Sequence, residues 1–230
     1  ADRARRRNGV EHTQLLHTAI LTHMSGLTPP EPLTRLRSVA TTEPLHDFDG
    51  LLDWAGLHAW IAENDLPGSG PVVAVEQLAG GSQNNVFALT RADGAAFVLR
   101  RPPRHLRANS NATMLREARV LAALADTEVP HPKFLAACDD LEVIGVNFYC
   151  MALVAGSVPM ASLPQRWMAD DFRLRLGPVM VDAIAKLGAV DATAKGLDDF
   201  GKADNWLARQ VARWRDQLDG KPLQLEYATT

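Results

Sequence analysis

Short runs in which apolar and polar residues alternate fill much of the first two thirds of the chain, and longer helical patterns follow them. The alternating runs are rich in β-branched and aromatic residues and are bounded by Gly, Pro and Asp, which is typical of strands. Asp93-Gly94 between two of these runs is a strong signal for a tight hairpin turn. We therefore expect five strands, at residues 72–78, 86–90, 96–100, 133–138 and 145–154.

Apolar residues at spacings of three and four predict helices in four places, two before residue 156 and two after it. The first helix is expected to begin near Asp49 and to stop at the breaker cluster of residues 66–70. The second carries Glu117, and Asn111 or Thr113 is expected to cap it. Of the two late helices, one has Asp170 or Asp171 in its first turn and the other carries an apolar stripe of Trp206, Val211, Trp214 and Leu218.

Residues 1–45 differ from the rest of the chain. Four arginines lie within the first seven residues, and a Pro-rich polar stretch follows at residues 28–32. An Arg-rich start can open a secretory signal, but Gln14, His17 and His23 interrupt the apolar region that such a signal requires. We interpret residues 1–45 as a poorly ordered extension or linker.

Composition narrows the function classes. The chain of 230 residues is 47% hydrophobic and 22% charged, which is ordinary for a globular protein, and its net charge of −3 argues against general nucleic-acid binding. Cys138 and Cys150 have neither metal-ligand spacing nor a disulfide framework, and no apolar run reaches the ~20 residues that cross a bilayer. We expect a cytoplasmic protein in which both thiols are small core residues, and in which Asp139 and Asp140 lie solvated on a turn rather than on a metal.

One stretch carries candidate chemistry. Gly80-Gly81-Ser82-Gln83-Asn84 stands between two predicted strands, where a glycine pair lets backbone approach a phosphate chain and small polar side chains add donors. Arg100 ends the third strand, and Glu117 follows on a helix, so that the carboxylate can pair with the guanidinium and hold it toward the same phosphates. An ordinary hairpin loop with a solvated Glu117 is the plainer interpretation, but four ordered features in one stretch are more specific than any one of them.

Six segments together resemble the aminoglycoside-phosphotransferase-like kinases: GGSQNNVFAL, FVLRRPP, REARVLAAL, VPHPKFLAACDD, GVNFYCMALVAG and FGKADNWLARQVARW. The resemblance spans roughly residues 48–218 and is strongest to the branch that is found alone in bacteria and fused to acyl-CoA dehydrogenases in animals. It implies an α+β, protein-kinase-like fold, in which residues 46–155 form a small lobe with a five-stranded antiparallel sheet and one helix. Residues 156–230 would then be the first helices of an incomplete large lobe.

The resemblance also implies a nucleotide site that takes ATP. The phosphates would lie on Gly80, Gly81, Ser82, Gln83 and Asn84, and would be reached by Arg100 as positioned by Glu117. The apolar walls around adenine would be Leu78, Val86 and Val98, and the strand that bonds the adenine edge would include Met151 and Leu153. The wider family usually has lysine where Arg100 stands, and a planar guanidinium is not equivalent to a point charge.

Phosphoryl transfer needs an aspartate to orient the hydroxyl, together with Asn and Asp ligands for Mg²⁺. No histidine of the chain begins the His-Gly-Asp-type loop that supplies these groups in the family; His46-Asp47 comes nearest but precedes the small lobe. We therefore expect no catalytic or metal-binding residue in this chain, which would be inactive alone, with Mg²⁺ and a small-molecule alcohol as partners of the complete enzyme. The acceptor stays open among aminoglycosides, choline-like alcohols, sugars and hydroxyacyl thioesters.

Two other functions compete with this hypothesis. A non-catalytic nucleotide-binding or interaction module derived from such a kinase fits the same motifs, with the late helices exposing apolar faces that favour self-association. A Rossmann dehydrogenase fits less well, because Gly80-Gly81 lies between hairpin strands and not before a helix. Neither nucleic acid nor membrane is an expected partner.

Overall fold

The structure of the chain is a computed structural model that describes residues 45–78, 84–156, 168, 170–201 and 204–219. Residues 1–44 of the expected extension lie outside these ranges, as do Gly80, Gly81, Ser82 and Gln83 of the glycine-rich turn.

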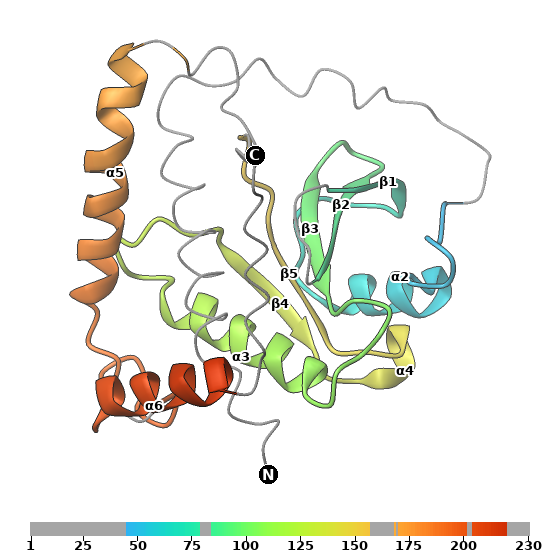
Figure 1. The fold of residues 1–230 in the computed structure, drawn as a ribbon. Helices are drawn as coiled ribbons and strands as arrows, with labels where there is room; N and C mark the ends of the chain where they lie inside the picture. The colour runs from blue at the N-terminus through green and yellow to red at the C-terminus, as the bar shows by residue number, and fades with distance from the viewer. Residues whose placement is uncertain (1–44, 79–83, 157–167, 169, 202–203, 220–230) are drawn as a thin grey trace, which may run out of the picture.

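A five-stranded antiparallel sheet is the centre of the fold, with the strands in the order β1-β2-β3-β5-β4 (Figure 1). The predicted α+β class and five-stranded sheet are thus confirmed. The strand bounds differ from the expected ones by a few residues: β1 is Val72–Gln77, β2 Asn85–Arg91, β3 Ala96–Arg101, β4 Phe134–Cys138 and β5 Phe148–Ala152.

The hairpin turn between β2 and β3 forms where the sequence predicts it. Gly94 has φ of 87°, a left-handed conformation that glycine adopts without strain, and its N–H donates to the Arg91 carbonyl at 2.9 Å. The Asp93 carboxylate accepts hydrogen bonds from the backbone N–H groups of Ala95 at 3.0 Å and Ser69 at 2.6 Å. The turn is therefore tied both to itself and to the segment that precedes β1.

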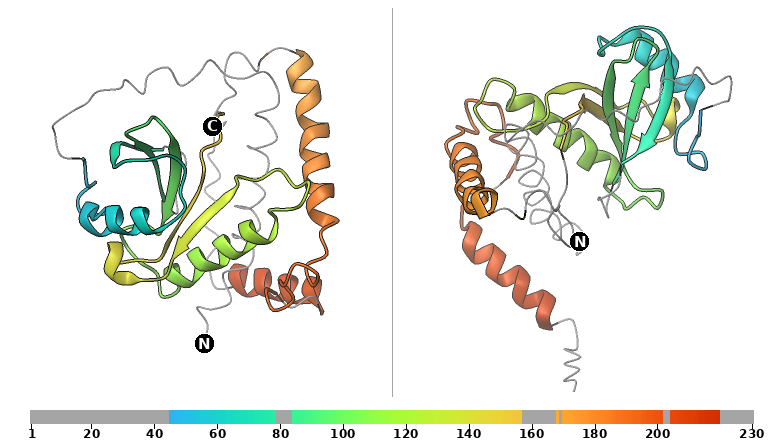
Figure 2. Two further views of the ribbon diagram at one scale, coloured as in Figure 1. Left: turned by 180° about the vertical axis from the view of Figure 1, so that it is seen from behind. Right: turned by 90° about the horizontal axis from the view of Figure 1, so that it is seen from above.

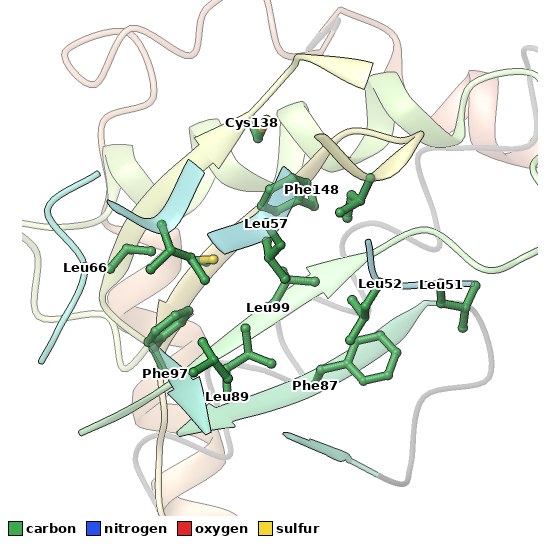
Figure 3. Packing of buried hydrophobic residues seen from close by; sticks show 14 of the residues in the cluster. Leu51, Leu52, Leu57, Leu66, Phe87, Leu89, Phe97, Leu99, Cys138 and Phe148 are labelled. Carbon is green, nitrogen blue, oxygen red and sulfur yellow. The ribbon is translucent and has the colours of Figure 1, made fainter. Parts of the chain in front are cut away.

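The main hydrophobic core lies between one face of the sheet and α2 (Trp54–Glu63). Figure 3 shows Phe87, Leu89, Phe97 and Leu99 of β2 and β3 on the side of the sheet where Leu57 of α2 lies. These five side chains are completely buried, and their alternation along β2 and β3 is the period of two that the sequence pattern carries. The packing of β2 and β3 against α2 is therefore the one that the spacing of their large apolar residues predicts.

Helix α2 begins later than expected. Asp53, and not a residue near Asp49, is its N-cap, and its carboxylate accepts hydrogen bonds from the N–H groups of Ala55 and Gly56. Trp60 packs against Phe148 in an edge-on arrangement, with 4.8 Å between the ring centroids, so it is a packing residue.

Helix α3 (Ser110–Ala123) covers part of the opposite face of the sheet. Met114, Ala118 and Leu121 of this helix are buried against Tyr149 of β5. The expected cap at Asn111 or Thr113 is wrong: Asn109 is the N-cap residue and makes no side-chain capping bond. Asn111 instead accepts the backbone N–H of Asn147 at 3.1 Å, which anchors the start of α3 to the chain before β5.

The plain turn expected at Asp139 and Asp140 is wrong in part, because these residues lead into one turn of helix, α4 (Leu141–Ile144). Asp140 caps it by accepting the N–H of Glu142 at 2.9 Å, and Gly145 ends it in the left-handed conformation with φ of 77°. Asp140 is thus a capping residue of this helix.

Two further helices follow, α5 (Asp170–Gly188) and α6 (Trp206–Asp219). Both views in Figure 2 place them on the far side of α3 from α2. Among the residues that the structure describes, none belongs to a helix that is long and apolar enough to cross a bilayer.

Candidate functional site

The sheet register places four of the expected nucleotide-site residues on one face. Val86 of β2 pairs with Arg100 of β3, and Val98 of β3 pairs with Met151 of β5. Directly paired residues point to the same face, and residues two apart along a strand do so too. All four side chains therefore lie on the face opposite the main core, which is the face that α3 covers only in part.

The central contact of this face is an ion pair between Arg100 and Glu117. The Arg100 Nε donates to Glu117 Oε2 at 2.9 Å, and the two side chains are only 15% and 7% exposed. Strand β3 and helix α3 meet at this pair, so the carboxylate fixes the direction of the guanidinium. The predicted pairing is confirmed, whereas a role in binding phosphate stays a prediction.

Tyr149 is the third member of the site, and it pairs across the sheet with Arg100. Its hydroxyl donates to the same carboxylate oxygen of Glu117 at 3.1 Å. Burial raises the pKa of Tyr149 far above its ordinary value, against the opposing effect of the Arg100 charge. Burial acts to lower the pKa of Arg100, but Tyr149 and Glu117 outweigh it and raise that pKa. Near neutral pH Arg100 is therefore a charged guanidinium and Tyr149 a neutral phenol.

Sequence reasoning did not single out Tyr149. It treated residues 148–154 as a buried strand, and the register that sets Tyr149 beside Arg100 cannot be read from one strand alone. An aromatic residue with a polar end in an otherwise apolar run was the available signal, because a buried tyrosine hydroxyl usually finds a partner.

The glycine-rich segment connects to the end of the sheet where Arg100 lies. Strand β1 ends at Gln77, and β2 begins at Asn85, which pairs with Arg101. The described residues next to the segment are half-buried: Leu78, whose N–H donates to the Val86 carbonyl at 2.8 Å, and Asn84. Leu153 is also half-buried, but β5 ends one residue before it, at Ala152, so Leu153 lies outside the strand in which it was expected.

The adjacent Arg101 differs sharply from Arg100, because its side chain points to the other face of the sheet. It is 4% exposed, and it donates to the carbonyl oxygens of Pro102, at 3.2 Å, and of Leu51. Burial, with a smaller contribution from the charge of Arg104, lowers the pKa of Arg101 to about 10. Arg101 thus ties β3 to the segment before α2, while Arg100 faces the candidate site.

No group of three or more His, Cys, Asp or Glu side chains that could hold a metal ion occurs among the described residues. The two cysteines, Cys138 and Cys150, are both buried and unpaired with each other. Burial raises the pKa of each thiol, so neither is an activated nucleophile.

A sequence profile of the phosphotransferase enzyme family matches residues 74–229. The chain belongs to this family. The match begins within β1 and extends through β5, α5 and α6, and thus includes the Arg100–Glu117 ion pair. The predicted family membership is confirmed.

Relatives of this phosphotransferase-family chain include long proteins. It is 33% identical over 148 residues to acyl-CoA dehydrogenase family member 11 of Gallus gallus, covering 64% of this chain and 18% of that protein. It is 30% identical over 193 residues to the protein of the same name from Rattus norvegicus, covering 82% of this chain and 24% of that one. The chain therefore spans less than a quarter of the length of these curated relatives.

A solved structure shares the fold. A provisionally assigned aminoglycoside phosphotransferase from Ralstonia eutropha JMP134 superposes with a TM-score of 0.60 at 37% identity, over 73% of this chain and 47% of that one. The predicted protein-kinase-like α+β fold is thus confirmed for the larger part of the chain.

Proposed function

We propose that this chain is the nucleotide-binding part of an ATP-dependent kinase that phosphorylates a hydroxyl group of a small molecule. The observation that carries the proposal is the buried ion pair of Arg100 and Glu117, set on the same sheet face as Val86, Val98 and Met151. Family membership supports the reaction class.

The chemistry of this face suits ATP. The half-buried Val86 offers apolar surface to a base, and Arg100, two residues beyond the buried Val98 along β3, offers a cation to the phosphates. Glu117 and Tyr149 hold that cation in one direction, so little side-chain entropy is lost when phosphate binds. ATP supplies the phosphoryl group, and the chain's own residues bind and orient it.

Titration calorimetry of the 230-residue chain with ATP, with and without Mg²⁺, tests nucleotide binding. We expect the unmodified chain to bind ATP weakly. Arg100→Gln should abolish this binding, and Arg100→Lys should weaken it because the planar guanidinium is lost. Arg215→Gln is the control: it removes the same charge at an exposed position of α6 and should leave the binding intact. Absence of ATP binding, or equal effects of the Arg100 and Arg215 variants, would overturn the proposal.

By itself, the chain is not expected to transfer phosphate, since none of its seven histidines begins a His-Gly-Asp-type loop. Phosphotransfer to any acceptor by the isolated chain would contradict this part of the proposal. The relatives' descriptions differ in the substrate they suggest, so an acceptor screen on the product of the whole gene should compare hydroxyacyl thioesters with aminoglycosides.

A second candidate function is a non-catalytic interaction module. The observation that favours it is an exposed apolar stripe on α6 that consists of Leu207, Val211, Trp214 and Leu218, of which Leu207 and Trp214 are 72% and 53% exposed. Such a module would bind a partner through α6 whether or not ATP is present. Binding to a partner that is lost on substitution in the stripe, combined with no ATP binding, would favour this function over the first.

A further inference from the structure

Helix α3 is held from a second side, away from the sheet. Val120 and Leu124 are buried in a separate cluster. The residues packed around them come from the end of α5 and the loop beyond it: Leu187, Val190, Leu197 and Phe200. We call residues 196–200 of this loop the 196–200 segment. The helix that presents Glu117 is thus held between the sheet and this segment.

Two arginines of α3 bind the 196–200 segment directly. Arg116 donates to the Phe200 carbonyl at 2.8 Å, and its guanidinium carbon lies 3.9 Å from the centre of the Phe200 ring. Arg119 binds Asp199 through both terminal nitrogens, at 2.9 Å and 2.7 Å, and also donates to the Gly196 carbonyl. A bidentate arginine–carboxylate pair fixes orientation as well as distance.

These arginines flank Glu117 in the sequence but lie on another side of the helix. Successive residues of an α-helix are turned by about 100°, so Arg116 and Arg119 point away from the direction of Glu117. A shift or rotation of α3 that loosens their contacts with the segment must therefore also move Glu117 relative to Arg100.

We propose that Arg116 and Arg119 are positioning residues, which hold α3 against the 196–200 segment and thereby set Glu117 at hydrogen-bond distance from Arg100. The expected effect on ATP affinity rests on the proposed function, whereas the expected effect on the Arg100–Glu117 hydrogen bond does not. The 196–200 segment is in this way linked to the candidate site through α3.

The Arg119–Asp199 ion pair is exposed and the Arg100–Glu117 ion pair is buried, so a loss of the first should affect the second more than it affects the fold. The Arg119 and Asp199 side chains are 47% and 66% exposed, and an exposed pair contributes little to global stability. Breaking it should leave the fold intact. The Arg100–Glu117 hydrogen bond is buried and directional, so a displacement of α3 by a fraction of an ångström weakens it.

The experiment reads the ion pair directly, by the Nε–Hε cross-peak of Arg100 in the NMR spectrum of the nitrogen-15-labelled chain. Arg100→Lys identifies the peak by removing it. Arg116→Ala and Arg119→Ala test the proposal, and Arg119→Lys keeps the charge without the fork. Lys186→Ala is the matched control, since it removes an ion pair of 2.8 Å with Asp182 that lies wholly within α5.

We expect the Arg100 peak to shift or broaden in both alanine variants, to change less in Arg119→Lys, and to stay in place in Lys186→Ala. Circular dichroism checks that each variant is folded. An unchanged peak in the two alanine variants, or an equal change in the control, overturns the proposal.

ATP titration of the same variants separates this proposal from the proposed function. We expect affinity to fall roughly two- to fivefold in Arg116→Ala and Arg119→Ala, the scale of one exposed ion pair or cation–π contact. Unchanged affinity in both would overturn the positioning role. Failure of the unmodified chain to bind ATP would overturn the proposed function, and the Arg100 peak would still decide the positioning role.

Discussion

Tyr149 and Arg100 donate to one and the same oxygen of Glu117, at 3.1 Å and 2.9 Å. The phenol comes from β5, the guanidinium from β3 and the carboxylate from α3, so this single oxygen joins three elements. Because both hydrogen bonds end on one oxygen, a rotation of the carboxylate that breaks one bond also disturbs the other. Tyr149 therefore restrains Glu117 even though it carries no charge near neutral pH.

Tyr149→Phe should destabilise the chain by about 2 kcal/mol, because it removes a buried hydrogen bond to a charged group while keeping the ring. Urea denaturation followed by circular dichroism measures the change. The loss should be smaller in a Glu117→Gln background, since neighbouring groups of one network are coupled. Equal losses in the two backgrounds would show that the phenol and the carboxylate act independently.

Alkaline pH should act through the same hydroxyl. Burial raises the folded pKa of Tyr149 above the unfolded value of about 10, so the folded state holds this proton more tightly. The resulting stability is fully present below about pH 10 and is lost as pH rises above it. The free-energy gap between the chain and Tyr149→Phe should therefore shrink above about pH 10. Titration of Cys150, whose pKa burial also raises, is common to both proteins and cancels in this difference.

Glu117→Gln should cost about 3 kcal/mol, because it removes one charge of a buried pair and leaves the other. Glu63→Gln, at an exposed position in the last turn of α2, makes the same chemical change and should stay within about 0.5 kcal/mol of the unmodified chain. Urea midpoints of the two variants give the comparison. Similar midpoints would mean that the pair contributes nothing to the fold.

Much of the fold could be predicted from the sequence, because the signals were local. The spacing of two between Phe87 and Leu89 in β2, and between Phe97 and Leu99 in β3, places these side chains on the face that the main core covers. The Asp93-Gly94 turn joins these strands, and its left-handed glycine is a signal that two adjacent residues carry. The pairing of Arg100 with Glu117, 17 residues further along the chain, could not be predicted from local patterns alone, and the family resemblance supported it.

What the sequence could not provide depends on contacts between distant segments. Asn111 looks like a helix cap, but its amide oxygen accepts the N–H of Asn147, which is 36 residues away. Arg100 and Arg101 are identical side chains in sequence, and only the pleat of β3 sends one to the candidate site and the other into the core. The short helix α4 is different, because its sequence contains a signal for each end. Asp140 is a typical N-cap residue and Gly145 a typical C-terminal glycine, so this helix could have been predicted in place of a plain turn.

Gly56→Ala should destabilise the chain by about 1–3 kcal/mol through overpacking, despite the better helix propensity of alanine. A Cβ at this position of α2 would lie 2.4 Å from the Val143 carbonyl oxygen of α4, and a backbone oxygen cannot swing aside. Gly188→Ala, at the end of α5, meets nothing within 4 Å and should be neutral or slightly stabilising. Thermal melts of the pair measure the difference, and equal effects would mean that α2 and α4 separate easily.

The exposed stripe of α6 should make the chain self-associate. Leu207, Val211, Trp214 and Leu218 recur at spacings of four, three and four, and each is more than half exposed. A contiguous apolar surface of this kind favours burial against a second copy when nothing else covers it. Val211→Glu places a charge within the stripe and should shift the chain toward monomer in sedimentation experiments. Ala208→Glu adds the same charge at an exposed position of α6 outside the stripe, and should leave association unchanged. A monodisperse monomer at all concentrations of the unmodified chain would contradict this prediction and would also weaken the interaction-module alternative, because both depend on the same four side chains.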